Sequence, residues 1–199
     1  MRRLAPAAAM AGLLGLAGLS AQPPSPQTWT ISAAPPELRA TISRADVMIA
    51  TMQDALLREL QDGLARGGPA GALASCHLDA AALSERLARS HGIPAGRTSD
   101  RLRQPANAAR PWAAGIVREH AGQRARDIEG FAVDLGDRLG VIRPIAERPM
   151  CAGCHGPAES LSPAVRDALA ARYPADRAIG FQDGEIRGWY WVEMPKVLR

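Results

Sequence analysis

The chain lacks most of the features that would link it to nucleic acid or to a membrane. Lys196 is its single lysine, and neither a basic run nor basic residues interleaved with aromatic ones occurs, so nucleic-acid binding is not expected. No internal repeat is visible. After the first 20 residues no apolar stretch is long enough to cross a bilayer. What remains is long enough for one domain with its own core.

The amino terminus has the pattern of a secretory signal peptide. Met1-Arg2-Arg3 is a short cationic start, and residues 4–19 form an Ala/Leu/Gly run that is short for a membrane span. Cleavage after Ser20 or Ala21 removes two arginines, which lowers the net charge from +4 to about +2. We therefore expect a signal peptide at 1–21 and a periplasmic protein without membrane attachment after cleavage. An uncleaved anchor is the alternative.

The segment after the signal peptide differs in composition from the rest. Residues 22–36 hold five prolines and several small polar residues, which is typical of a tether. The sequence thus predicts a linker at 22–36 and a single domain at 37–199.

One short motif near the carboxyl end carries recognisable chemistry: Cys151-Ala152-Gly153-Cys154-His155. It has the spacing of a c-type haem attachment site, because two thiols two residues apart can each add to one vinyl group of the same porphyrin. His155 is then the proximal iron ligand, and another group fills the opposite face of the iron. With one such motif, the sequence predicts one haem c, attached through Cys151 and Cys154.

Two other kinds of site share the CxxC spacing. A structural zinc site needs four Cys or His ligands, and the rest of the chain holds one more cysteine and three histidines, none paired at knuckle spacing. A thioredoxin-like pair opens a helix after a buried strand. Here Pro149-Met150 precede the motif and Gly156-Pro157 follow its histidine, a pattern that predicts a turn. Haem is therefore the expected cofactor.

The first half of the domain has the apolar periodicity of long helices. Apolar residues recur at steps of three and four over residues 42–64 and predict a helix that ends near Gly67-Gly68. Pro69 can start the next helix, which runs to about Ser90. Its apolar face comprises Leu73, Cys76, Ala80, Leu83 and Leu87. Cys76 is consequently expected to point inward.

Later segments combine shorter helices with β-rich pieces. Helices are expected at 108–119, with Pro111 in its first turn, and at 163–172. Strands are expected at 131–133, 139–142 and 189–192. Because helices come first and strands later, the sequence predicts the α+β class. An all-helical cytochrome is the alternative.

Several short pieces, taken in order, resemble a bacterial family of single-haem c-type proteins catalogued as a domain of unknown function. The resemblance covers roughly residues 37–192. It is carried by residues 96–108 (Gly-Arg-Thr-Ser-Asp-Arg-Leu-Arg-Gln-Pro-Ala-Asn-Ala), Arg143-Pro144-Ile145, the CxxCH-Gly run, and residues 173–178 (Tyr-Pro-Ala-Asp-Arg-Ala) leading to Arg187-Gly188.

This resemblance implies a PAS-like fold, with an antiparallel sheet and a helical amino-terminal part. Such domains are free-standing in the periplasm or serve as sensing domains of membrane histidine kinases. The resemblance also implies that the iron is held between the motif histidine and a cysteine of the helical part. The matching residues here are His155 and Cys76.

The residues alone leave the sixth iron ligand open. A lone buried cysteine is most often a small hydrophobe, and an odd thiol in an exported protein can pair with another chain. If the Cys76 thiolate binds iron, its negative charge stabilises the ferric state and lowers the reduction potential. The alternatives are an open or water-bound iron, or one of Met48, Met52, Met150, Met194, His77, His91 and His120.

The carboxylates of a haem need polar partners, and the chain is rich in arginine, whose guanidinium pairs well with carboxylates. In so Arg-rich a chain, an arginine can equally be solvated or bridged to a surface acid. Five of the eight aromatic residues lie between Tyr173 and Trp191, where they form either a wall of the haem pocket or a plain core strand. The candidates to hold the propionates are Arg97, Arg103, Arg143, Tyr173 and Arg187.

These features together predict a redox or small-ligand sensor. A change in iron oxidation state, or binding of a diatomic gas, would displace Cys76 and move its helix, and an unidentified redox or signalling partner would receive the signal. Periplasmic electron transfer is the alternative. Peroxidase-like activity would require an open iron position and a base, His91 or His120.

Overall fold

The computed structural model describes residues 26–197, without the side chains of residues 74–84 and 87. The predicted signal peptide therefore lies outside the described residues, as do the side chains of Cys76 and His77. Within the described part, no helix combines the length and hydrophobicity that a membrane crossing requires.

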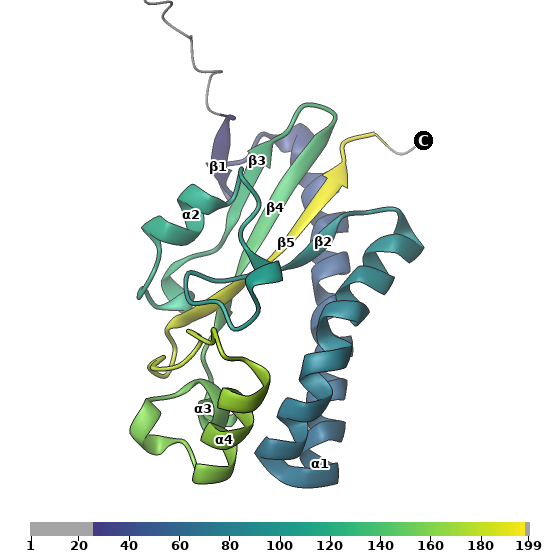
Figure 1. The fold of residues 1–199 in the computed structure, drawn as a ribbon. Coiled ribbons are helices and arrows are strands. Elements are labelled where there is room, and N and C mark those ends of the chain that lie inside the picture. The colour runs from purple at the N-terminus through teal and green to yellow at the C-terminus, as the bar shows by residue number, and fades with distance from the viewer. Residues whose placement is uncertain (1–25, 198–199) are drawn as a thin grey trace, which may run out of the picture.

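Five antiparallel strands form one sheet in the order β1-β3-β4-β5-β2 (Figure 1). β3 (Phe131–Asp134) and β4 (Arg138–Ala146) form a hairpin, and β5 (Ile186–Pro195) pairs along β4. The hairpin turn contains Gly136 at φ 86°, a conformation that favours glycine. The three strands predicted from the sequence are thus confirmed.

Two edge strands were not expected from the sequence. β1 (Thr28–Thr30) pairs with β3, so the segment predicted to be a tether contributes a strand to the sheet. β2 (Ala95–Thr98) pairs with β5 and has little β-forming character of its own. Gly96 is required there because the Trp191 ring covers it, and a Cβ at this position would lie 2.7 Å from that ring.

Helix α1 (Arg39–His91) consists of two arms, a first arm at 39–66 and a second arm at 69–91, which form an antiparallel hairpin beside the sheet (Figure 1). The backbone leaves helical geometry at Gly67 and Gly68, and Gly68 has a positive φ of 60°. Gly92, also left-handed, caps the second arm. The predicted break between two long helices is therefore confirmed.

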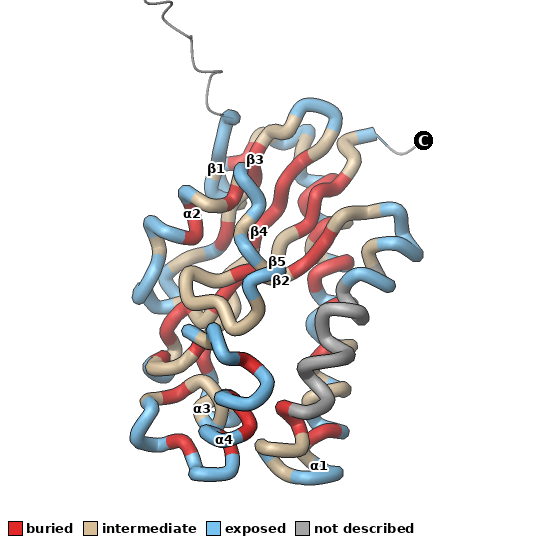
Figure 2. The backbone as a smooth tube through the Cα atoms, in the orientation of Figure 1, coloured by how far each residue is buried: buried red, intermediate tan, exposed pale blue. Residues whose placement is uncertain are grey.

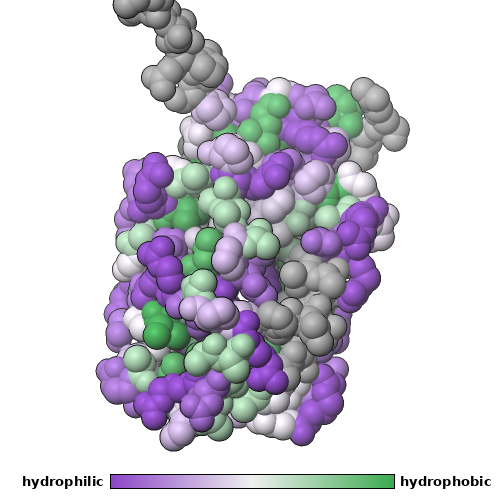
Figure 3. All heavy atoms as spheres, in the orientation of Figure 1, coloured by the Kyte–Doolittle hydropathy of each residue, from purple (hydrophilic) through white to green (hydrophobic). Residues whose placement is uncertain are grey.

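The core consists of two clusters, one on each face of the sheet, and Figure 2 shows the buried segments along the central strands. Strand β4 alternates, with Leu139 and Val141 facing the first arm of α1 and Ile142 facing α2 (Ala114–Glu119). The first arm contributes its predicted apolar stripe to this core: Ile42, Ala45, Ile49, Met52 and Leu56. On one face of the described part, Figure 3 shows hydrophilic residues interspersed with smaller hydrophobic groups.

Helix α2 begins later than predicted, because the residues before it form turns. The Arg110 guanidinium and the Trp112 indole N–H both donate to the Glu193 carboxylate, at 2.8 and 2.9 Å. Residues two apart do not face the same way on a helix, so this shared contact is incompatible with the helix predicted from residue 108.

The chain between β4 and β5 forms two short α-helices, which lie beyond one end of the sheet (Figure 1). They are α3 (Pro149–His155) and α4 (Pro163–Arg172), and the second confirms its prediction. The Ser162 hydroxyl caps α4 by accepting the Val165 N–H, and α4 packs against Leu73 of the second α1 arm. The α+β class, an antiparallel sheet with a long amino-terminal helical part, is thereby confirmed.

Candidate functional site

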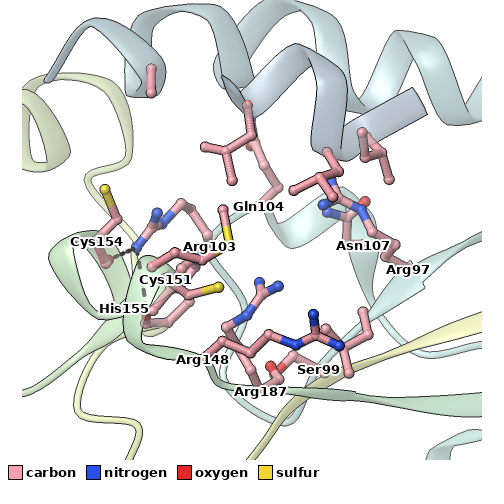
Figure 4. Close-up of a pocket in the computed structure, with 18 of the residues that line it drawn as sticks. Arg97, Ser99, Arg103, Gln104, Asn107, Arg148, Cys151, Cys154, His155 and Arg187 are labelled. Atoms are coloured by element: carbon pink, nitrogen blue, oxygen red, sulfur yellow. Dashed lines mark hydrogen bonds between the residues drawn. The ribbon is translucent and has the colours of Figure 1, made fainter. Parts of the chain in front are cut away.

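A cavity of about 310 Å³ opens between the α1 hairpin, the end of the sheet and α3 (Figure 4). Its volume falls in the range of small-molecule sites, roughly 300–1,000 Å³. The wall formed by α1 is mainly apolar, with Gln53 and Glu59 as its polar residues, and includes Leu56, Leu57, Leu60, Leu64, Ala72 and Leu73. The opposite side carries the CxxCH motif and a group of arginines.

The motif residues Cys151, Cys154 and His155 all line this cavity because they share one short helix. Positions 151 and 154 are one turn apart, and 155 follows 151 by four residues, so all three lie on neighbouring rows of α3. The turn predicted for this segment is therefore wrong. Pro149 stands in the first helical turn, where its missing N–H costs nothing, and the helix ends at the extended backbone of Gly156.

The two thiols are half-buried, and no disulfide joins them. Two backbone bonds fix the end of α3 against the following chain: the carbonyls of His155 and Gly156 accept the N–H groups of Phe181 and Gly180, at 3.0 and 2.8 Å. The motif side chains are thus held on a braced helix.

His155 is arranged as a neutral imidazole with one nitrogen left for a metal. Its Nδ1 lies 2.7 Å from the Ala178 carbonyl oxygen and donates to it, which leaves Nε2 with a free lone pair. Burial holds the pKa of His155 well below its ordinary value, and the positive charges of Arg187 and Arg103 lower it further. A neutral ring is the form that binds metals.

Arg103 braces the motif and does not project freely into the cavity. Its Nη2 donates to the carbonyls of Cys154 (2.6 Å) and Ala178 (3.2 Å), and its Nε pairs with Asp176 at 3.1 Å. Asp176 in turn accepts the Ala178 N–H at 2.8 Å. The Ala178 carbonyl therefore serves both Arg103 and His155, so this network determines how the imidazole is oriented.

The cavity has a cationic edge. Arg97, Arg148 and Arg187 lie along it with Ser99 (Figure 4), and Glu59 is the one acidic residue among the described lining residues. Arg97 and Arg187 were predicted from the sequence, whereas Arg148 was missed. Its position three residues before Cys151 was the available signal. A clustered set of guanidinium groups favours anionic groups such as carboxylates.

Arg143 does not belong to this edge, which corrects its prediction as a cofactor contact. Its Nε and Nη2 donate to the two carboxylate oxygens of Asp46, at 2.8 and 2.7 Å, and its Nη1 donates to the Glu129 carbonyl. The bidentate pair clamps α1 to β4 and satisfies the guanidinium away from the cavity.

The aromatic residues of the last segment divide between the cavity and the core. Tyr173 and Tyr190 line the cavity, and Phe181 lies edge-on to His155 with 6.3 Å between ring centroids. Trp189 is buried in the core on the α2 face of the sheet, and Trp191 packs beside it. Part of this segment therefore forms a wall of the cavity, and part forms the predicted core strand.

The structure places the other sixth-ligand candidates as follows. Met48, Met52 and Met194 pack in the core between α1 and the sheet. His91 is exposed and His120 is half-buried against Phe131, and neither is among the residues lining the cavity. Met150 does line it and is 48% exposed. Cys76 and His77 are in the second arm of α1, and their side chains lie outside the described residues.

Comparison with known proteins agrees with this arrangement of elements. A crystal structure of the cyanobacterial heme-protein Tll0287 is similar to 83% of this chain and 99% of that chain, with a TM-score of 0.56 and 19% sequence identity. No curated protein matches. The family model described as Tll0287-like matches residues 36–195, which is most of the chain. The chain therefore belongs to the Tll0287-like family.

Proposed function

We propose that this chain carries one haem c in the cavity, with Cys151 and Cys154 bound to its vinyl groups and His155 Nε2 bound to its iron. One observation carries the proposal: two thiols that are not joined in a disulfide and a neutral imidazole stand on one helix and line the same cavity. These are the groups that covalent haem attachment requires.

The rest of the cavity fits the same cofactor. The leucines of α1 offer an apolar wall to a flat macrocycle, while Arg97, Arg148 and Arg187 offer guanidinium groups to two propionates. The similar cyanobacterial protein Tll0287 is a heme-protein, which supports haem as the cofactor of this chain. The haem would supply one-electron redox chemistry and an iron that can bind small ligands.

We assign the sixth iron position to Cys76. Leu73 and Ala72, three and four residues earlier on α1, line the cavity, and this is the spacing of one helical face. A thiolate opposite His155 would favour ferric iron and a low reduction potential.

With this ligand pair the protein is best suited to sense redox state or a diatomic gas in the periplasm. Displacement of Cys76 would release the second arm of α1, which packs against α4 through Leu73, and so convert a change at the iron into a movement of helices. The receiving partner would be a redox or signalling protein. Electron transfer is the second candidate, favoured by the exposure of Arg148 and Met150 beside Cys151, which places this edge of the cavity near solvent.

Mass spectrometry tests the attachment. The full-length chain, expressed with a c-type haem maturation system, should be exported, lose its signal peptide and gain the mass of one haem. The double variant Cys151→Ala/Cys154→Ala should lose that covalent mass, whereas Cys76→Ser should retain it. A wild-type product without covalent haem overturns the proposal.

Spectroscopy tests the ligand and the role. Wild-type ferric protein should give a thiolate-type low-spin EPR signal, and Cys76→Ser should abolish it. An unchanged signal removes Cys76 as the ligand. Binding of CO or NO to the reduced protein, with an altered protease-cleavage pattern in α1, supports the sensor. Fast reversible reduction without ligand exchange supports electron transfer.

A further inference from the structure

Glu147 carries a buried carboxylate close to the cavity. It is not one of the residues proposed to contact the haem. Only 2% of the residue is exposed, and neither carboxylate oxygen has a hydrogen-bond partner. Its backbone is fixed, because its N–H donates to the Glu185 carbonyl at 2.8 Å and its own carbonyl accepts the Gly184 N–H at 2.9 Å. The carboxylate therefore stays inside, without the hydrogen bonds that would stabilise its charge.

One ion pair partly compensates this charge. Arg187 Nε lies 3.3 Å from Glu147 Oε2, but the geometry is not that of a hydrogen bond, and Nε also has no hydrogen-bond partner. Burial is the main cause that raises the pKa of Glu147, to about 7. A carboxyl whose pKa is raised in this way can gain or lose a proton near neutral pH.

The charges that surround Glu147 come from several elements. Arg187 and Arg103 favour its ionised form, whereas the negative charges of Glu185 and Asp183 favour its protonated form. Glu185 is engaged by the Arg101 guanidinium and by the Gln182 N–H, so it is not available to Glu147 as a hydrogen-bonding acid.

Arg187 connects Glu147 to the cavity. It lines the cavity together with His155, and its positive charge, like that of Arg103, acts on the pKa of both residues. A change of one charge unit inside the cavity must therefore alter the electrostatic potential around Arg187. Glu147, which pairs with Arg187, can respond to this change by binding a proton.

We propose that Glu147 is a redox-linked proton-binding site: it takes up one proton from solvent when a one-electron donor reduces the bound ferric haem to ferrous, and returns it on reoxidation. The proposal rests on the proposed function. The balance is one electron from a reduced carrier protein and one proton from water for each haem, so that no net charge accumulates in the cavity. Reduction is therefore favoured at low pH, and the reduction potential falls as pH rises.

Potentiometric titration of the full holoprotein at a series of pH values tests this. Wild type should show a reduction equilibrium that changes by up to tenfold per pH unit around neutrality, equivalent to about 59 mV for one electron. Glu147→Gln, which imitates the protonated carboxyl, should abolish most of this slope and hold the potential near the wild-type value at low pH. Glu159→Gln removes the same charge from an exposed position near the motif and should keep the wild-type slope.

Redox-difference infrared spectroscopy on wild type gives a readout that does not depend on a variant folding. Reduction should produce a protonated-carboxyl band that shifts in D₂O, and Glu147→Gln should lack it. A holoprotein whose potential is flat around neutral pH, or a slope that persists in folded Glu147→Gln, overturns the proposal while leaving haem binding intact. A chain without covalent haem overturns both.

Discussion

Replacing Arg103 with Met removes the brace that holds α3 while it keeps most of the side-chain volume. The Arg103 and Asp176 side chains are only 13% and 9% exposed, so their ion pair is largely desolvated. Arg103→Met leaves the Asp176 carboxylate buried without its cation, and breaking a buried pair in this way costs about 3–5 kcal/mol. For a domain of this size, this loss lowers the melting temperature by roughly 6–20 °C.

Urea unfolding of the holoprotein, followed by far-ultraviolet circular dichroism, measures this loss. In a double-mutant cycle with Asp176→Asn, the double variant should be less destabilised than the sum of the single variants, because the neutral amide leaves no unpaired charge, with a coupling energy of about 0.5–3 kcal/mol. Arg166→Met, at an exposed position on α4, is the control and should stay within about 0.5 kcal/mol of wild type.

Two results would refute this reasoning. One is an unfolding free energy of Arg103→Met within about 1 kcal/mol of wild type, which would mean that the pair is not desolvated. The other is a cycle in which the two substitutions are additive, which would mean that Arg103 and Asp176 do not stabilise each other in solution.

Three further predictions follow from other contacts. Arg143→Gln should leave the haem absorption spectrum and the reduction potential unchanged, whereas Arg187→Gln should shift the reduction potential. Equal shifts in the two variants would mean that Arg143 contacts the haem as well. Met52→Ala should lower the unfolding free energy by about 2–5 kcal/mol, because Met52 is fully buried, without changing the ferric spectrum; a spectrum typical of a lost axial ligand would contradict its placement in the core. Because the pKa of Glu147 is raised from 4.5 to about 7 in the fold, its contribution to stability is fully present below pH 4.5 and is lost as pH rises through about 7. Glu147→Gln should therefore be more stable than wild type at pH 8 by up to about 3 kcal/mol in chemical denaturation, and a difference that does not change with pH would contradict the assignment.

Local patterns predicted the elements whose signal lies within a few consecutive residues. The apolar stripe of α1, its break at Gly67 and Gly68, and helix α4 all follow from helical spacing and from proline and glycine positions. Strand β2 could not be found in this way, because its glycine is selected by the Trp191 ring of a strand that comes nearly 100 residues later. Helix α2 was predicted too long for the same reason, since Glu193 holds the turn before it.

The amino-acid sequence by itself determined the reactive groups of the site, because the spacing of Cys151, Cys154 and His155 is a local property of the chain. It did not determine which charged residues surround them. Arg143 and Arg187 look alike in sequence, but the register of the sheet and the packing of α1 direct one to Asp46 and the other into the cavity beside Glu147. Tertiary structure decides this because an arginine goes to whichever carboxylate the fold brings within reach, and a carboxyl changes its pKa only where the fold removes water from it.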